Sequence, residues 1–125
     1  MGSDGEKILV VDDDAYIRKL VVKILTQRGY VAVPAADAWQ AMDLRQKHSI
    51  DLIILDLRMP GPVDGEQLLF ALRDQGNDTP IIVVSGWVDD ELSQNPPACV
   101  HAVMKKPIDI DDFTTTVEGI LTKVS

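Results

Sequence analysis

Four short apolar runs in this chain each end at side chains that can handle phosphate or metal ions. The residues at these ends are Asp12 and Asp13, then Asp56, then Ser85, and finally Lys105 and Lys106. If the runs are parallel strands of one sheet, their carboxyl ends meet at a single edge, which is where ligands bind in such sheets. The pattern therefore predicts one site that accepts a phosphoryl group.

The carboxylates at this edge predict a metal ion. Asp12 and Asp13 follow one strand directly and Asp56 follows another, and carboxylates held close together repel one another unless a cation compensates them. Mg²⁺ prefers hard oxygen ligands and commonly bridges one or two carboxylates to a phosphate. We therefore expect Mg²⁺ to be held by Asp12, Asp13 and Asp56 together with the backbone carbonyl of Arg58.

The remaining side chains supply the other parts that phosphoryl transfer to a carboxylate needs. The reaction requires a nucleophilic oxygen, a cation over the phosphoryl oxygens, and further donors for the charge that spreads over them. Asp56 is the expected nucleophile, Lys106 the partner of the phosphoryl oxygens, and Ser85 the hydroxyl donor. An acyl phosphate is labile and adds about two negative charges, so it can pull Ser85 and its loop into a new arrangement. The predicted chemistry is therefore also a switch.

The elements that position these residues follow from the spacing of apolar side chains. Unbroken apolar runs predict strands at 7–11, 30–34, 51–55, 80–84 and about 100–104. Helical spacing predicts helices at 15–28, 36–48, about 64–75 and 109–122. Any helix between the last two strands is expected to be short, at about 89–94, because the prolines of Asn95-Pro96-Pro97 forbid a regular helix there. Strands that alternate with helices imply right-handed βαβ units, and hence a mostly parallel sheet with helices on both faces.

Single residues refine this pattern. Pro34 suits an edge strand because it cannot donate to a neighbouring strand. Asp37 and Asp109 are expected to cap the helices that follow them, and Asp14 to cap a helix or face solvent. Trp39 is expected to be a half-buried helix residue rather than a platform for a ligand.

Length and composition indicate one globular domain. A chain of 125 residues can bury one core, and we assign residues 1–6 to an N-terminal tail and 7–123 to the domain. No apolar stretch approaches the roughly 20 residues that span a bilayer, and the first residues lack the pattern of a secretory signal. We expect a soluble, cytoplasmic protein with no membrane partner.

Charge and metal-binding side chains exclude other classes. The formal charge of −8 argues against direct binding to nucleic acid, because contacts with phosphates need a basic face. Cys99 is the only cysteine, so an internal disulfide and a thiolate metal cluster are excluded, and Cys99 is expected to be a packing residue. His48 and His101 lie away from the predicted site and are not expected to bind a metal.

Four motifs follow one another along the chain. They are Ile8-Leu9-Val10-Val11-Asp12-Asp13-Asp14, Leu55-Asp56-Leu57-Arg58-Met59-Pro60 with Asp64-Gly65, Val84-Ser85-Gly86, and Lys106-Pro107. They resemble the motifs of the receiver domain of two-component response regulators, and the resemblance covers residues 7–123. Each motif alone is a weak signal, but four together are a strong one.

The resemblance implies an α/β fold of the flavodoxin-like (βα)5 type, a three-layer sandwich whose parallel five-stranded sheet has the order 2-1-3-4-5. It implies Mg²⁺ dependence and phosphorylation of Asp56 by a sensor histidine kinase or a histidine phosphotransfer protein. Strand alternation aims Lys105 and Lys106 oppositely, and the family motif selects Lys106 as the residue that enters the site. It also implies a cis peptide between Lys106 and Pro107. We expect a monomer or weak dimer, with an unknown downstream effector reading a surface around residues 85–106.

The chain departs from the family pattern at several positions. Val103 stands where family members often carry an aromatic switch residue, and the loop at 61–65 is one residue longer than usual. Pro96-Pro97 interrupts the segment where the family has its fourth helix. Arg58 and Trp87 are bulky and could screen water from an acyl phosphate, so we expect slow self-dephosphorylation.

Other functions stay open at this point. A Mg²⁺-dependent phosphohydrolase with an aspartyl-phosphate intermediate would need a second carboxylate two residues after the nucleophile, where Arg58 stands. An FMN carrier of the flavodoxin type would need a phosphate-binding loop, and the aspartates at 12–14 would repel the phosphate. A pseudo-receiver that is never phosphorylated is a further alternative, although all the reactive groups are present. We expect a signalling module that accepts phosphate on its own side chain and is not a turnover enzyme.

Overall fold

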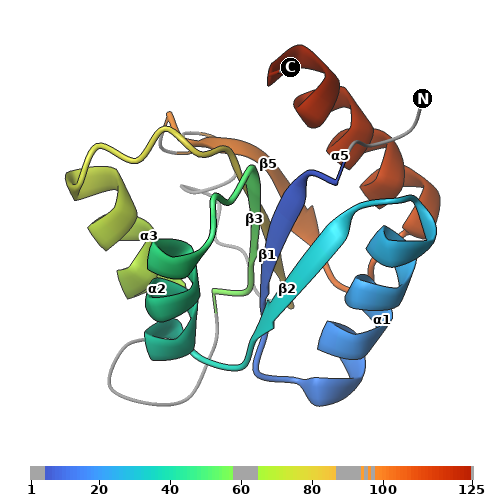
Figure 1. Ribbon diagram of the computed structural model, residues 1–125, viewed down its shortest axis with the longest axis horizontal. Helices are drawn as coiled ribbons and strands as arrows, with labels where there is room; N and C mark the ends of the chain where they lie inside the picture. Colours follow the sequence, from blue (N-terminus) through green and yellow to red (C-terminus); the bar gives the residue numbers. More distant parts are fainter. Residues whose placement is uncertain (1–4, 58–64, 87–93, 95, 97, 125) are drawn as a thin grey trace.

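Five parallel strands form the central sheet of the computed structural model, which describes residues 5–57, 65–86, 94, 96 and 98–124 (Figure 1). The strands are β1 (Lys7–Val11), β2 (Val31–Ala35), β3 (Leu52–Leu55), β4 (Ile81–Ser85) and β5 (Val100–Lys105). Their order is β2-β1-β3-β4-β5, which confirms the expected order. The chain leaves β1 toward one edge to form β2 and then returns to the other side of β1 for β3. The ends of β1 and β3 therefore flank the switch in strand order, where open α/β sheets bind ligands.

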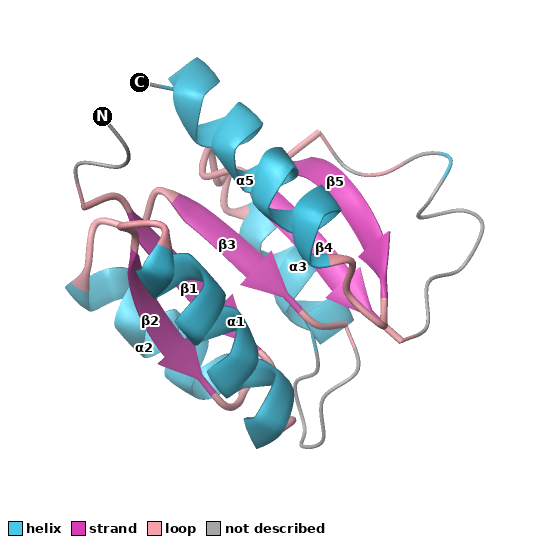
Figure 2. Ribbon diagram, turned by 90° about the vertical axis from the view of Figure 1, so that its right-hand side faces the viewer, coloured by secondary structure: helices cyan, strands magenta, loops and turns pink. Residues whose placement is uncertain are grey.

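Four helices among the described residues cover the two faces of the sheet. They are α1 (Ala15–Gln27), α2 (Ala38–Lys47), α3 (Gly65–Asp74) and α5 (Ile110–Val124). Helices α1 and α5 lie on one face, and α2 and α3 lie on the other (Figures 1 and 2). The molecule is thus the expected three-layer sandwich. No helix in the described ranges is long and apolar enough to span a bilayer.

Alternation along the strands divides the core into two apolar layers. Ile8 and Val10 pack with α1 and α5 in what we call the α1–α5 layer. Leu9 and Val11 pack with α2 and α3 in the α2–α3 layer. The four residues of β3 alternate in the same way between the two layers. A strand buried on both faces must be apolar at every position, which explains the unbroken runs in the sequence.

The helix ends and the sheet edge confirm several local predictions. The Asp14 carboxylate accepts hydrogen bonds from two backbone amides at the start of α1, and Asp37 accepts one at the start of α2. Asp109 accepts from the Asp112 amide at 3.0 Å. Pro34 lies in the edge strand β2, as expected. Cys99 is partly buried against the α2–α3 layer, which agrees with a packing role.

One expectation is wrong, and another lies beyond the described residues. Trp39 is 66% exposed, because it lies on the outer side of α2 while Ala38 and Ala41 face the sheet. It is therefore not a half-buried residue. The short helix expected at 89–94 falls almost entirely outside the described residues.

Strand β5 contains an irregularity that matters for the site. Val100 pairs with Ile81 and Ala102 pairs with Ile82, so His101 is an extra residue in a β-bulge. Val100 belongs to the α2–α3 layer, whereas Ala102 and Met104 pack against the α1–α5 layer. The bulge therefore shifts the alternation of all later residues in β5 by one position.

Candidate functional site

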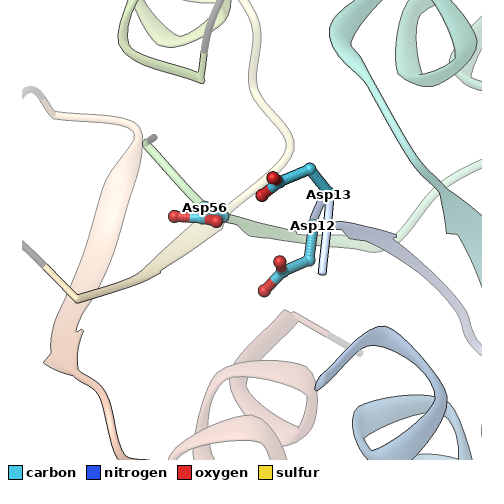
Figure 3. Close-up of side chains that lie close together, drawn as sticks. All are labelled: Asp12, Asp13 and Asp56. Carbon is cyan, nitrogen blue, oxygen red and sulfur yellow. The ribbon is translucent and has the colours of Figure 1, made fainter. Parts of the chain in front are cut away.

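Three carboxyl groups converge at the carboxyl end of the sheet. Asp12, Asp13 and Asp56 each offer one oxygen, and these oxygens all lie within 4.8 Å of one another. Figure 3 shows Asp12 and Asp13 at the end of β1 and Asp56 at the end of β3, with the carboxyl group of Asp13 turned toward Asp56. Asp12 and Asp56 are buried and Asp13 is exposed. The structure thus brings together three of the predicted metal ligands, and their hard oxygens fit Mg²⁺.

Hydrogen bonds of the sheet place two of these aspartates side by side. Val11 pairs with Leu55, and the next residue on each strand is an aspartate. The Asp56 amide donates to the Val11 carbonyl at 3.0 Å, and the Asp12 amide donates to the Ala35 carbonyl at 3.1 Å. Val11 and Leu55 point into the α2–α3 layer, so alternation turns Asp12 and Asp56 toward the α1–α5 side.

Lys106 joins the two buried carboxylates. Its Nζ donates to Asp12 Oδ2 at 2.8 Å and to Asp56 Oδ2 at 3.4 Å, and its side chain is 20% exposed. Burial by itself would lower the pKa of the ammonium group, but hydrogen bonding and charge from Asp12, together with Asp56, outweigh burial and raise that pKa above 10.5. Lys106 is therefore held in its charged form and compensates a pair of carboxylates that would otherwise repel each other.

The bulge in β5 explains which of the two adjacent lysines reaches the carboxylates. Residues after the bulge alternate so that Met104 faces the α1–α5 layer, and Lys106 follows with the same orientation. Lys105 points the other way and is exposed. The expectation that only one lysine enters the site agrees with this geometry.

Arg18 supports the site but escaped the sequence reasoning, and Gly65 entered it only as part of a family motif, without a role. Arg18 Nη1 donates to the backbone carbonyl of Asp12 at 2.7 Å, which ties the first turns of α1 to the end of β1. A Cβ added to Gly65 would overlap the carbonyl oxygen of Asp56 and lie 2.7 Å from its carbonyl carbon. The only signals in the sequence were a basic residue one turn into a helix for Arg18 and the Asp64-Gly65 motif for Gly65.

Of the other predicted residues, the structure describes some and leaves two outside the described ranges. Ser85 is fully buried at the end of β4, and its carbonyl accepts from the Lys106 amide at 2.9 Å. Lys106 and Pro107 are joined by the expected cis peptide. Val103 is partly buried against the α2–α3 layer. Arg58, whose backbone carbonyl is an expected metal ligand, lies outside the described residues, and so does Trp87.

Comparison with known proteins identifies the family. The family model of the response regulator receiver domain matches residues 8–118. The chain belongs to the response regulator receiver domain family. Sporulation initiation phosphotransferase F of Bacillus subtilis is 32% identical to it over 120 residues, which are 94% of both chains. Some other relatives are longer: the chain spans 13% of the length of a sensor kinase and 52% of a response regulator.

Solved receiver structures agree with the fold. The receiver domain of the Francisella response regulator 1452 superposes with a TM-score of 0.88 at 28% identity, and the match covers 97% of this chain and 100% of that one. The response regulator TrrA of Thermotoga maritima, solved in complex with Mg²⁺ and BeF, gives a TM-score of 0.80 at 26% identity and covers 93% of this chain and 99% of its own. The chain is thus a receiver domain of phosphoaspartate signalling whose acidic pocket is formed by Asp12, Asp13 and Asp56. It accepts phosphate and is not a catalytic enzyme in the usual sense.

Proposed function

We propose that Asp56 accepts a phosphoryl group from the phosphohistidine of a sensor histidine kinase or histidine phosphotransfer protein in the cytoplasm. The observation that carries this proposal is the convergence of three carboxylates with Lys106 across two of them. The relatives support the choice of donor, because they include a phosphotransferase of sporulation initiation and a sensor kinase.

Each residue has a proposed part in the transfer. A carboxylate oxygen of Asp56 forms a bond to phosphorus while the bond from phosphorus to the donor imidazole nitrogen breaks, and that nitrogen keeps the electron pair and takes up a proton. Lys106 releases the carboxylates and pairs with the phosphoryl oxygens. Asp12, Asp13 and Asp56, with the Arg58 carbonyl, are the groups that would hold Mg²⁺, which neutralises charge on those oxygens when bound.

Phosphorylation would alter the contacts that now hold the site. Lys106 binds Asp12 and Asp56 directly, and its amide is bonded to the Ser85 carbonyl. A phosphoryl group on Asp56 brings strong acceptor oxygens to this place and competes for the ammonium group of Lys106 and the hydroxyl of Ser85. We therefore expect the surface around residues 85–106 to change on phosphorylation and to be read by an effector.

Intact mass spectrometry after incubation with acetyl phosphate or phosphoramidate and Mg²⁺ tests the proposal. We expect a gain of one phosphoryl group that is lost in Asp56→Asn and in the presence of a chelator. Continuous release of phosphate at enzymic rates would instead favour the phosphohydrolase. A folded protein that gains no mass with either reagent or with a phosphorylated histidine donor would contradict acceptance of phosphate and favour the pseudo-receiver.

A further inference from the structure

Basic and acidic residues are strongly segregated along this chain. Residues 15–36 contain four basic residues and no acidic one, whereas the rest of the chain contains eight basic and 20 acidic residues. The basic stretch makes up α1 and β2, which lie side by side at one edge of the sheet (Figure 1). An otherwise acidic molecule therefore carries one cationic region.

Within this region, a groove of about 340 Å³ runs between α1 and the edge strand β2. Val22 and Pro34 give it an apolar floor, and Arg18, Lys19 and Lys23 line it from α1. Lysine and arginine side chains commonly lay their apolar stems along such a surface and keep their charged ends at its rim. The groove thus combines an apolar floor with a cationic rim.

These three cations are not neutralised by the protein itself. In the part of the chain that the structure describes, none of them forms an ion pair, whereas Arg28 pairs with Glu118 and Lys47 pairs with Asp43. Lys19 and Lys23 lie one helical turn apart, and like charges at that spacing destabilise a helix slightly. The arrangement works against the stability of α1 and leaves the charges of Lys19 and Lys23 available to another molecule, whereas the guanidinium group of Arg18 already donates to the Asp12 carbonyl.

We propose that this groove binds an acidic amphipathic segment of a partner protein. One or two apolar side chains of the segment would enter the groove, and flanking carboxylates would meet Lys19 and Lys23. The proposal does not rest on the function proposed for Asp56, because Lys19 and Lys23 are not among the residues that form the acidic site.

Charge favours a short segment over other negatively charged occupants. An extended polyanion such as DNA or an anionic membrane would also face the acidic remainder of the chain and be repelled by it. A second copy of this chain carries the same formal charge of −8. A short segment can lie on the basic region alone and avoid this repulsion.

Fluorescence anisotropy with a labelled synthetic peptide tests the proposal on the full chain. The probe is an amphipathic helical peptide with Leu on one face and Glu on the other, and its control has Gln in place of every Glu. We expect saturable binding of the Glu peptide that weakens about tenfold or more in the double variant Lys19→Gln, Lys23→Gln and falls with added salt. The double variant Lys47→Gln, Arg73→Gln removes the same charge from α2 and α3, on the opposite face of the sheet, and should bind as the wild type does.

Four outcomes would overturn the proposal. One is the absence of binding by the Glu peptide to folded protein, and another is equal binding by the Gln peptide. A third is saturable binding of phosphatidylglycerol vesicles or duplex DNA that depends on Lys19 and Lys23, which would assign the groove to a polyanion. The fourth is self-association in sedimentation experiments that the same double variant abolishes, which would assign it to a second copy.

Discussion

The interior and the carboxyl end of the central strands differ sharply although they are adjacent in the sequence. Residues 8–11 and 52–55 lie between two apolar layers and contribute burial without chemistry. Asp12 and Asp56 follow at once and place two carboxylates in buried positions, where they need Lys106 to compensate them. Burying charge opposes folding unless the charge is paired. The apolar strand interiors therefore supply the stability that offsets the cost of burying the carboxylates of the site.

The largest expected loss of stability comes from the interior. Phe113 is fully buried in the α1–α5 layer, and Phe113→Ala should lower the free energy of unfolding by about 3–5 kcal/mol because it leaves a cavity. Urea unfolding followed by circular dichroism measures this loss. Ile110→Ala, on the same helix but 48% exposed, is the control and should lose much less. If the two variants unfold at the same urea concentration, the α1–α5 layer does not support the fold as described.

Gly65 lies at the start of α3, where this helix contacts the backbone of Asp56. Gly65→Ala must shift either the start of α3 or the backbone of Asp56, and such overpacking costs about 1–3 kcal/mol. We expect the rate of phosphorylation by acetyl phosphate to fall together with the melting temperature. Gly119→Ala is the matched control, because an added Cβ there meets nothing within 4 Å. An alanine variant at position 65 with wild-type rate and stability would refute the close contact with Asp56.

Removing the cation of the site should have a smaller effect on stability. Lys106→Met leaves Asp12 and Asp56 without their shared cation and should cost about 1–2 kcal/mol without Mg²⁺, less than for a fully buried pair because Lys106 is partly exposed. Added Mg²⁺ should raise the melting temperature of this variant more than that of the wild type. Lys105→Met, at an exposed position, should behave as the wild type. Equal responses of all three proteins to Mg²⁺ would rule out competition between Lys106 and the metal.

The stability that Lys106 provides should depend on pH. Its pKa is raised in the folded protein, so this stabilisation is complete below the unfolded-state pKa near 10.5 and is lost as pH rises through the folded-state pKa. Burial, with help from Glu118 and Glu6, also raises the pKa of Tyr30, which acts in the same direction. The difference in unfolding free energy between wild type and Lys106→Met separates the contribution of Lys106 from that of Tyr30, because both proteins contain Tyr30. That difference should shrink above pH 10.5, and a constant difference would exclude the ion pairs as its source.

The smallest effect is expected at the exposed carboxylate. Asp13→Asn removes one of three converging negative charges and should raise stability by about 0.3–1 kcal/mol without Mg²⁺, while weakening Mg²⁺ binding in calorimetric titrations. Asp78→Asn removes the same charge from an exposed position before β4 and should change neither quantity. If Asp13→Asn binds Mg²⁺ as tightly as the wild type, Asp13 is not a ligand of the metal.

Much of the fold could be predicted because the strands are buried on both faces. Their apolar runs are short and unbroken, and the predicted strands differ from the observed ones by about one residue at each end. Asp12, Asp13 and Asp56 stood out because a carboxylate that ends such a run is unusual without a partner. The order of the strands, in contrast, came from the resemblance to a family, because spacing alone does not fix which strands pair.

Contacts between distant elements explain what the sequence could not show. Counting by twos from Val100 would direct Lys105 rather than Lys106 to the carboxylates, and only the bulge at His101 reverses that choice. No periodicity reveals that Arg18 reaches the Asp12 carbonyl or that Gly65 lies against Asp56. Trp39 was misjudged because a large apolar side chain on a helix is usually partly covered, and here it is not.

The alternation that turns Asp56 toward the α1–α5 side also sets which changes of length this chain can accept. One residue inserted into β3 would send the acceptor to the opposite face of the sheet, away from Lys106. Two inserted residues would restore the face but move the carboxylate about 7 Å along the strand direction, beyond the reach of the same ammonium group. Loops can therefore lengthen and shorten during evolution, whereas the number of residues in the central strands is fixed by the reaction they serve.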